Sequence, residues 1–179
     1  MRMLEGPETD TCQRAPRRRR GRLIAAALAI AIIGAACGPS VAAGPPACVG
    51  PGAPPDAISS GVLAATNNDR AANGLAPLQW NAQLWCLASA WSTQIAGNGT
   101  LTHRDLNATI RSAEYASYRT LGENLLRGPA ALAPESMEVA WMNSSGHRAN
   151  VLSAQFTSAA VAYTMTGDGQ VFVTVNFGG

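Results

Sequence analysis

The chain has 179 residues, with 13 basic and 11 acidic side chains and a formal net charge of +2. Seven of the basic residues precede residue 38, and the remainder carries six arginines against eight acidic residues, a formal charge of −2. A mildly acidic surface offers no stripe of positive charge for phosphate groups, so the composition excludes nucleic acid as a class of partner.

The first 37 residues have the order of an export signal: basic residues, an apolar run and then small residues. The apolar run, residues 23–36, is too short to span a bilayer comfortably as a permanent helix. It ends in Gly34-Ala35-Ala36-Cys37, which resembles a bacterial lipoprotein box. Three outcomes stay open: cleavage with a lipid attached to the Cys37 sulfur, ordinary cleavage nearby, or an uncleaved anchor. We expect a domain that is secreted or anchored to the outer side of the cell membrane, and that meets the membrane only through its signal or lipid.

Residues 38–55 are rich in Gly, Pro and Ala and predict a tether, which is followed by a single folded domain over residues 56–179. That domain is long enough for one core, and we expect it to be a monomer. Two cysteines remain outside the signal, Cys48 and Cys86. In an exported protein they predict one disulfide, and two separate buried thiols are the alternative.

Apolar residues at helical spacing predict two helices in the first part of the domain. The first covers residues 57–73, with Asp56 as its N-cap, and an apolar linker over residues 75–80 follows it. The second follows Asn81, and its core-facing stripe consists of Leu84, Leu87, Ala88, Trp91 and Ile95. Cys86 falls on the opposite, outer face of this helix, where the tether could cross.

The second half of the domain predicts shorter helices and then strands. Residues 101–105 are expected to form a loop or short strand, residues 109–117 a weak helix and residues 122–126 a short strand. A further helix begins at Pro134, because proline suits the first helical position. Alternating side chains over residues 160–177 predict a β-hairpin with one face on the core. Helices followed by antiparallel strands indicate an α+β layered domain.

The only two histidines of the chain lie at the ends of predicted elements. His147 belongs to the first turn of a short helix for which Ser145 is the expected N-cap. There the helix dipole disfavours the imidazolium form and leaves a ring nitrogen free. With His103 and Glu123 it forms a set of two imidazoles and a carboxylate on three elements, typical of an open zinc-type site. The alternative is that each of these side chains satisfies a local backbone hydrogen bond.

Six motifs occur in the order of a known family. They are Asn67-x-x-Arg70 with Gly74-Leu75, Leu78-Gln79-Trp80 with Leu84, His103, Gly122-Glu123-Asn124, Trp141-Met142-Asn143-Ser144-x-Gly146-His147-Arg148-Ala149-Asn150-Val151-Leu152, and Asn176-Phe177. In this order they resemble the CAP superfamily, which groups cysteine-rich secretory proteins, venom allergens and plant pathogenesis-related proteins. The chain is similar in particular to the bacterial, SCP-like branch.

The resemblance implies a three-layer α-β-α sandwich with a central, mostly antiparallel sheet and a wide cleft. It also implies that His103 and His147 can hold a divalent metal there, with Glu123 as the acidic residue beside them. Zinc is the metal that we expect. The fuller family pattern has a second carboxylate about one turn after the helix tryptophan, and here Ser144 stands at that position. We therefore expect a weaker metal site, or one completed by water.

Two functions remain open at this point. The first is a binding module whose metal-lined cleft holds a lipid or another ligand of the cell envelope. The alternative is a metal-dependent hydrolase, a peptidase or esterase, in which Glu123 acts as the general base for a metal-bound water. The missing second carboxylate favours the binding module.

Overall fold

The computed structural model describes residues 48–179, so the predicted export signal, its Cys37 and residues 38–47 of the predicted tether lie outside the described residues. The elements are α1 (Ala57–Ala72), β1 (Gln79–Trp80), α2 (Ala82–Asn98), α3 (Leu106–Ile110), β2 (Leu121–Pro129), α4 (Pro134–Met142), α5 (Ser145–Val151), β3 (Ser158–Met165) and β4 (Gln170–Gly178). Within the described part, none of these helices has the length and apolar character needed to cross a membrane.

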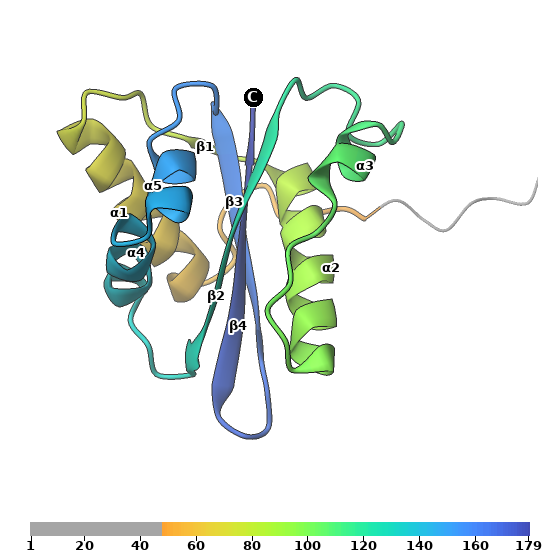
Figure 1. Cartoon of the computed structure of the whole chain (residues 1–179), viewed down its shortest axis with the longest axis vertical. Coiled ribbons are helices and arrows are strands. Elements are labelled where there is room, and N and C mark those ends of the chain that lie inside the picture. The colour runs from red at the N-terminus through yellow and green to blue at the C-terminus, as the bar shows by residue number, and fades with distance from the viewer. Residues whose placement is uncertain (1–47) are drawn as a thin grey trace, which may run out of the picture. The chain divides into compact units, whose positions relative to one another are not determined.

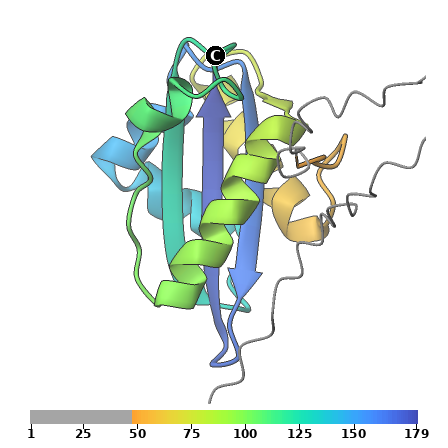
Figure 2. The same cartoon turned by 90° about the vertical axis from the view of Figure 1, so that its right-hand side faces the viewer.

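The strands form one sheet in the order β1-β3-β4-β2. Strand β4 pairs antiparallel with β2 and β3, whereas β1 pairs parallel with β3. Helices α1, α4 and α5 cover one face of the sheet (Figure 1), and α2 lies across the other face (Figure 2). The predicted α-β-α sandwich with a mostly antiparallel sheet is therefore confirmed.

Side-chain caps explain why the first two helices begin where the sequence predicts. A carboxylate oxygen of Asp56 accepts a hydrogen bond from the Ser59 amide at 2.8 Å. Asn81 accepts from the amides of Gln83 and Leu84 at 2.9 and 3.0 Å. Each bond satisfies amides that have no partner inside the first helical turn. Both predicted helices are confirmed to within one residue at their starts.

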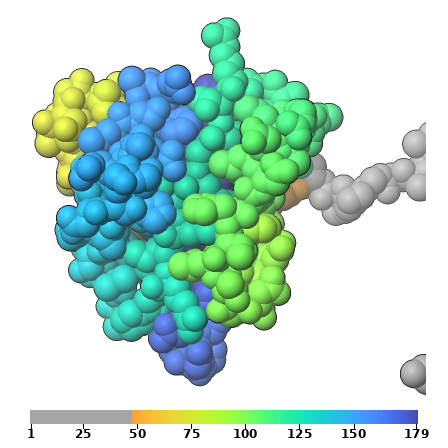
Figure 3. All heavy atoms as spheres, in the orientation of Figure 1, coloured from red at the N-terminus to blue at the C-terminus, as the bar shows by residue number. Residues whose placement is uncertain are grey.

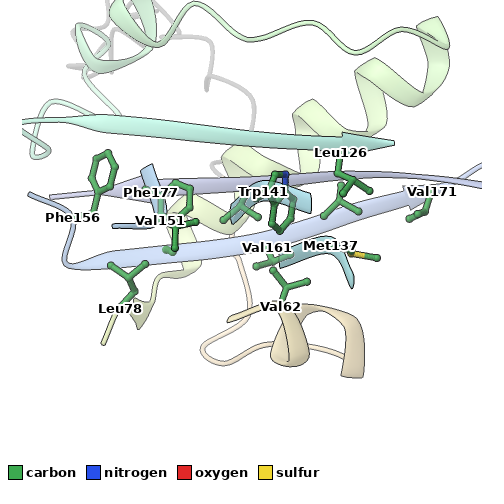
Figure 4. Close-up of a cluster of buried hydrophobic side chains, with 13 residues drawn as sticks. Val62, Leu78, Leu126, Met137, Trp141, Val151, Phe156, Val161, Val171 and Phe177 are labelled. Atoms are coloured by element: carbon green, nitrogen blue, oxygen red, sulfur yellow. The ribbon is translucent and has the colours of Figure 1, made fainter. Parts of the chain in front are cut away.

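The C-terminal hairpin is confirmed, but its prediction as a strand pair with one buried face is wrong. Strand β4 is buried along nearly its whole length, because helices cover both faces of the sheet. Val173, Val175 and Phe177 pack into a cluster with Trp141 and its neighbours (Figure 4), whereas Phe172 packs with Ile95 of α2 on the other face. The alternation of side chains identified the strands but did not reveal the second layer of helices.

Three shorter predictions need correction. The weak helix expected at residues 109–117 lies earlier, as α3, because the Asp105 carboxylate caps its start by accepting from the Ala108 amide at 2.9 Å. The short strand expected at residues 122–126 extends over the nine residues of β2. The linker over residues 75–80 ends in β1, whose two residues are too few to show a period.

Cys48 and Cys86 form the predicted disulfide, with their Cα atoms 5.9 Å apart. Cys86 is buried, because the chain before α1 covers the helix face that the sequence places outside. The Trp80 indole donates to the Pro51 carbonyl at 2.8 Å, and a Cβ on Gly50 would collide with the Ala82 carbonyl oxygen. The end of the predicted tether is therefore attached to the domain at Cys48, Gly50 and Pro51.

Candidate functional site

An open cleft of about 480 Å³ lies between the chain before α3, the start of β2 and the start of α5. In Figure 3 the blue atoms of α5 and the green atoms around α3 lie on its two sides. His103, Glu123 and His147 all line this cleft, so the structure brings the three predicted site residues together. Leu106 and Leu121 add apolar surface to a lining that is otherwise mostly polar.

Glu123 is buried at the floor of the cleft, and its carboxylate contacts the imidazole of His103. Its Oε1 atom lies 2.9 Å from Nδ1 of His103 and accepts from the Arg104 amide at 3.1 Å. The Glu123 side chain is 1% exposed, whereas that of His103 is 58% exposed. Nδ1 of His103 is thus engaged by Glu123, and Nε2 is the His103 ring nitrogen that this contact leaves unengaged.

His147 approaches His103 from the opposite side of the cleft. The two ring centroids are 6.4 Å apart and the ring planes are tilted by 48°. Burial lowers the pKa of His147, and the neighbouring His103 lowers it further. This direction agrees with the neutral imidazole expected from the sequence, and burial is its largest cause.

The start of α5 differs from the predicted one by one residue. Ser145 is the first helical residue, and Ser144 occupies the N-cap position without making a side-chain cap bond. The expected N-cap role of Ser145 is therefore wrong. Because Ser144 also lines the cleft, the position at which the family pattern has a second carboxylate lies at the edge of the site.

Three asparagines tie the site together, and the sequence identified them only as motif members. The Asn150 amide donates to the Glu123 carbonyl and to Oδ1 of Asn124, and the Asn124 amide donates to the His147 carbonyl. Asn176 on β4 lies 3.5 Å from the second carboxylate oxygen of Glu123. A weak signal existed for Asn150 alone, because asparagine is a poor residue inside a helix unless its side chain bonds elsewhere.

The donor set at the cleft is two imidazoles supported by one carboxylate. Among residues 48–179, no group of three or more His, Cys, Asp or Glu side chains is arranged to hold a metal ion, since Glu123 is turned toward Nδ1 of His103. For an ion held tetrahedrally by two ring nitrogens at about 2.1 Å, the ring centroids would lie roughly 5 Å apart. The observed 6.4 Å is wider than this, so the two rings would have to move closer together to share an ion. A carboxylate behind a histidine is also the usual support of a metal ligand, so the residues fit a divalent ion.

Comparisons with known proteins agree on one family. The model of the cysteine-rich secretory protein family, CAP, matches residues 63–177. YkwD of Bacillus subtilis (strain 168), itself described as uncharacterized, is 34% identical over 110 residues, which are 59% of this chain and 42% of YkwD. The chain thus spans about two fifths of the length of that curated relative.

Solved structures show the same fold. An extracellular protein of Bacillus anthracis that contains an SCP domain is 26% identical, with a TM-score of 0.53 over 67% of this chain and 39% of that one. An outer surface protein of Borrelia burgdorferi is 20% identical, with a TM-score of 0.57 over 65% of this chain and 88% of that one. The second likeness concerns the fold alone.

Proposed function

Because this chain belongs to the CAP family of cysteine-rich secretory proteins, we propose that it is an exported binding module. In this proposal His103 and His147 hold a divalent metal, zinc in first place, and the cleft binds a lipid or another ligand of the cell envelope. The observation that carries the proposal is the meeting of the two imidazoles, 6.4 Å apart, over a buried carboxylate that orients one of them.

Location outside the cytoplasm has independent support. The Cys48–Cys86 disulfide requires an oxidising compartment to form and persist. The predicted export signal and the extracellular SCP-domain protein of Bacillus anthracis agree with such a compartment. We therefore place the domain in or outside the cell envelope.

Metal binding needs ring nitrogens that are free of protons. Burial and the neighbouring His103 lower the pKa of His147, which favours its neutral imidazole, and the contact of His103 Nδ1 with Glu123 leaves Nε2 available. A bound metal would supply a Lewis acid with open positions for oxygen donors. The protein's own contribution is to hold the two rings at one side of an open cleft.

The cleft is large enough for a small ligand. Its volume of about 480 Å³ falls within the range typical of ligand pockets. Polar groups surround the two imidazoles, and Leu106 with Leu121 provides apolar contact beside them. This combination suits a ligand with a polar, oxygen-bearing head and an apolar part.

Hydrolysis ranks second because of how Glu123 is held. A general base must be free to accept a proton from water. Oε1 of Glu123 already accepts from His103 and from the Arg104 amide, and the side chain is 1% exposed. Its position favours orientation of His103 over proton transfer.

Zinc titration calorimetry tests the metal part of the proposal. We expect the wild-type protein to bind zinc, and the double variant His103→Ala with His147→Ala to lose this binding while it stays folded by circular dichroism. Zinc-loaded wild type should also gain melting temperature from lipid or cell-wall extracts, whereas the double variant should not. The proposal fails if zinc binding is the same in both proteins, or if no extract changes melting temperature or elution. If the protein hydrolyses a peptide or an ester and a chelator abolishes this activity, the metal-dependent hydrolase becomes the better-supported function.

A further substitution tests the role of the missing carboxylate. Ser144→Glu is expected to tighten zinc binding about tenfold, the size of effect typical of a supporting carboxylate beside a metal ligand. Ser145→Glu is the matched control, because it adds the same charge one residue away at an exposed position outside the cleft lining. Calorimetry should separate the two variants, and equal zinc affinities would show that only the added charge matters.

A further inference from the structure

We propose that Asn150 and Asn124 form a bridge that sets the separation of the His103 and His147 imidazoles. Both asparagines are positioning residues in this proposal, since they act through the backbone of the site residues. The inference rests on the proposed metal-binding function for its consequence, but the bridge itself is a property of the metal-free protein.

The bridge runs from the backbone of Glu123 to the backbone of His147. Asn150 Nδ2 donates to the Glu123 carbonyl at 3.1 Å and to Oδ1 of Asn124 at 2.9 Å, which uses both of its amide hydrogens. Asn124 Nδ2 then donates to the His147 carbonyl at 3.1 Å. The Glu123 carboxylate contacts Nδ1 of His103. The same hydrogen bonds therefore connect the residue that orients the His103 imidazole with the backbone of His147.

Helix α5 needs such support because it is intrinsically weak. It has only seven residues, and Ser144 makes no side-chain cap bond at its start. Isolated helices of this length are unstable in water, so contacts with the rest of the fold must hold it. The position of His147 therefore depends on which bonds secure each end of α5.

The two ends of α5 are secured by different residues. At the C-terminal end, the buried Arg70 guanidinium donates to the carbonyls of Val151 and Ser153 at 2.8 and 2.9 Å. Near the N-terminal end, the Asn124 amide holds the His147 carbonyl, and Asn150 orients that amide. Arg70 fixes the helix in the fold, whereas the asparagine bridge fixes the turn that carries His147.

The bridge also requires a close approach of α5 to β2. A Cβ added to Gly122 would lie 2.6 Å from the Phe156 ring and 3.3 Å from Oδ1 of Asn150. Real Cβ atoms do not come this close to a packed ring, so the Phe156 ring requires glycine at residue 122, and the Asn150 side chain lies in tight contact with the same position. The bridge is thus built into the packing of the cleft floor.

Asn150→Ala, Asn124→Ala and their combination test the proposal in two ways. Each single variant should weaken zinc binding by about tenfold or more, and the double variant should add little, because either change breaks the same bridge. In metal-free protein, hydrogen exchange at the α5 amides should accelerate more than exchange in the β3–β4 hairpin. If the alanine variants do not fold, Asn150→Gln replaces them in both measurements. This variant keeps the amide group but displaces it by one methylene, so the same changes in zinc binding and α5 exchange are expected.

Asn67→Ala is the matched control. Its side chain exchanges two hydrogen bonds with the Leu78 backbone, at 2.7 and 3.1 Å, and does not line the cleft. It should lower melting temperature without a selective change in α5 exchange or zinc affinity. Loss of stability in Asn150→Ala with unchanged zinc affinity and unchanged α5 exchange would overturn the bridge. If wild type binds no zinc, the proposed function fails, and the exchange measurement alone decides whether the bridge holds α5.

Discussion

Cys48→Ser is expected to lower the midpoint of thermal unfolding by about 10 °C. The disulfide joins residues separated by 38 positions. Cross-linking a loop of that length removes denatured-state entropy that corresponds to about 4 kcal/mol at room temperature. Cys48 is exposed, so the substitution removes the cross-link without removing a core side chain. Differential scanning calorimetry of wild type and variant measures the difference.

Reduction provides the control for this expectation. Wild type that has been unfolded and refolded in a thiol reductant should have the same unfolding midpoint as Cys48→Ser. The reductant should not lower the midpoint of the variant further. The segment over residues 48–55 would keep only weak contacts, such as the bond from the Trp80 indole to Pro51. Equal midpoints for oxidised wild type and Cys48→Ser would show that this segment adds nothing to the stability of the domain.

Local chemistry explains how much of the fold the sequence could predict. Asp56 and Asn81 are helix-capping residues, and the structure uses both of them as caps. Strand β1 could not be predicted from a pattern, because it has two residues and depends on pairing with Ser158 and Ala159 far along the chain. The burial of both faces of β4 likewise depends on α2, which packs against it only in the folded protein.

The candidate site, like the fold, could be predicted only in part from the sequence. Chemistry and motif order identified His103, Glu123 and His147, because few side chains can bind a metal and the chain has only two histidines. The asparagine bridge could not be predicted, since amide side chains are common and only their distances distinguish a bridge from surface positions. Glu138, the buried carboxylate of α4, does not line the cleft and faces α1, where it accepts a hydrogen bond from the Thr66 hydroxyl.

Glu138 is a buried carboxyl group outside the cleft, and it leads to the second large stability effect that we expect. It is 2% exposed, and it receives one hydrogen bond, from the Thr66 hydroxyl to Oε2 at 2.7 Å. Its Oε1 atom has no partner among the described residues. Burial raises the pKa of Glu138 from 4.5 to about 7; the Thr66 bond opposes this rise and Asp69 adds to it. The folded protein therefore keeps this carboxyl protonated at mildly acidic pH, where an exposed glutamate is ionised.

The direction of the pH dependence follows from that raised pKa. Below pH 4.5 the group is protonated in both the folded and the unfolded chain, and its contribution to stability is complete. Between pH 4.5 and about 7 only the unfolded chain loses the proton, so the free energy of unfolding falls as pH rises. Above that range both states are ionised and the loss is complete, at most about 3 kcal/mol.

Glu138→Gln should remove this loss, because glutamine keeps the shape of the side chain but cannot ionise. We expect the variant to unfold at a higher urea concentration than wild type at pH 8, and to differ little from it at pH 4.5. Glu135→Gln on the same helix is the matched control, since it removes the same charge at an exposed position. Its difference from wild type should not vary with pH in this range. A Glu138→Gln difference that is equally independent of pH would mean that Glu138 is already ionised in the folded protein at pH 4.5, and that α1 and α4 accommodate a buried charge without cost.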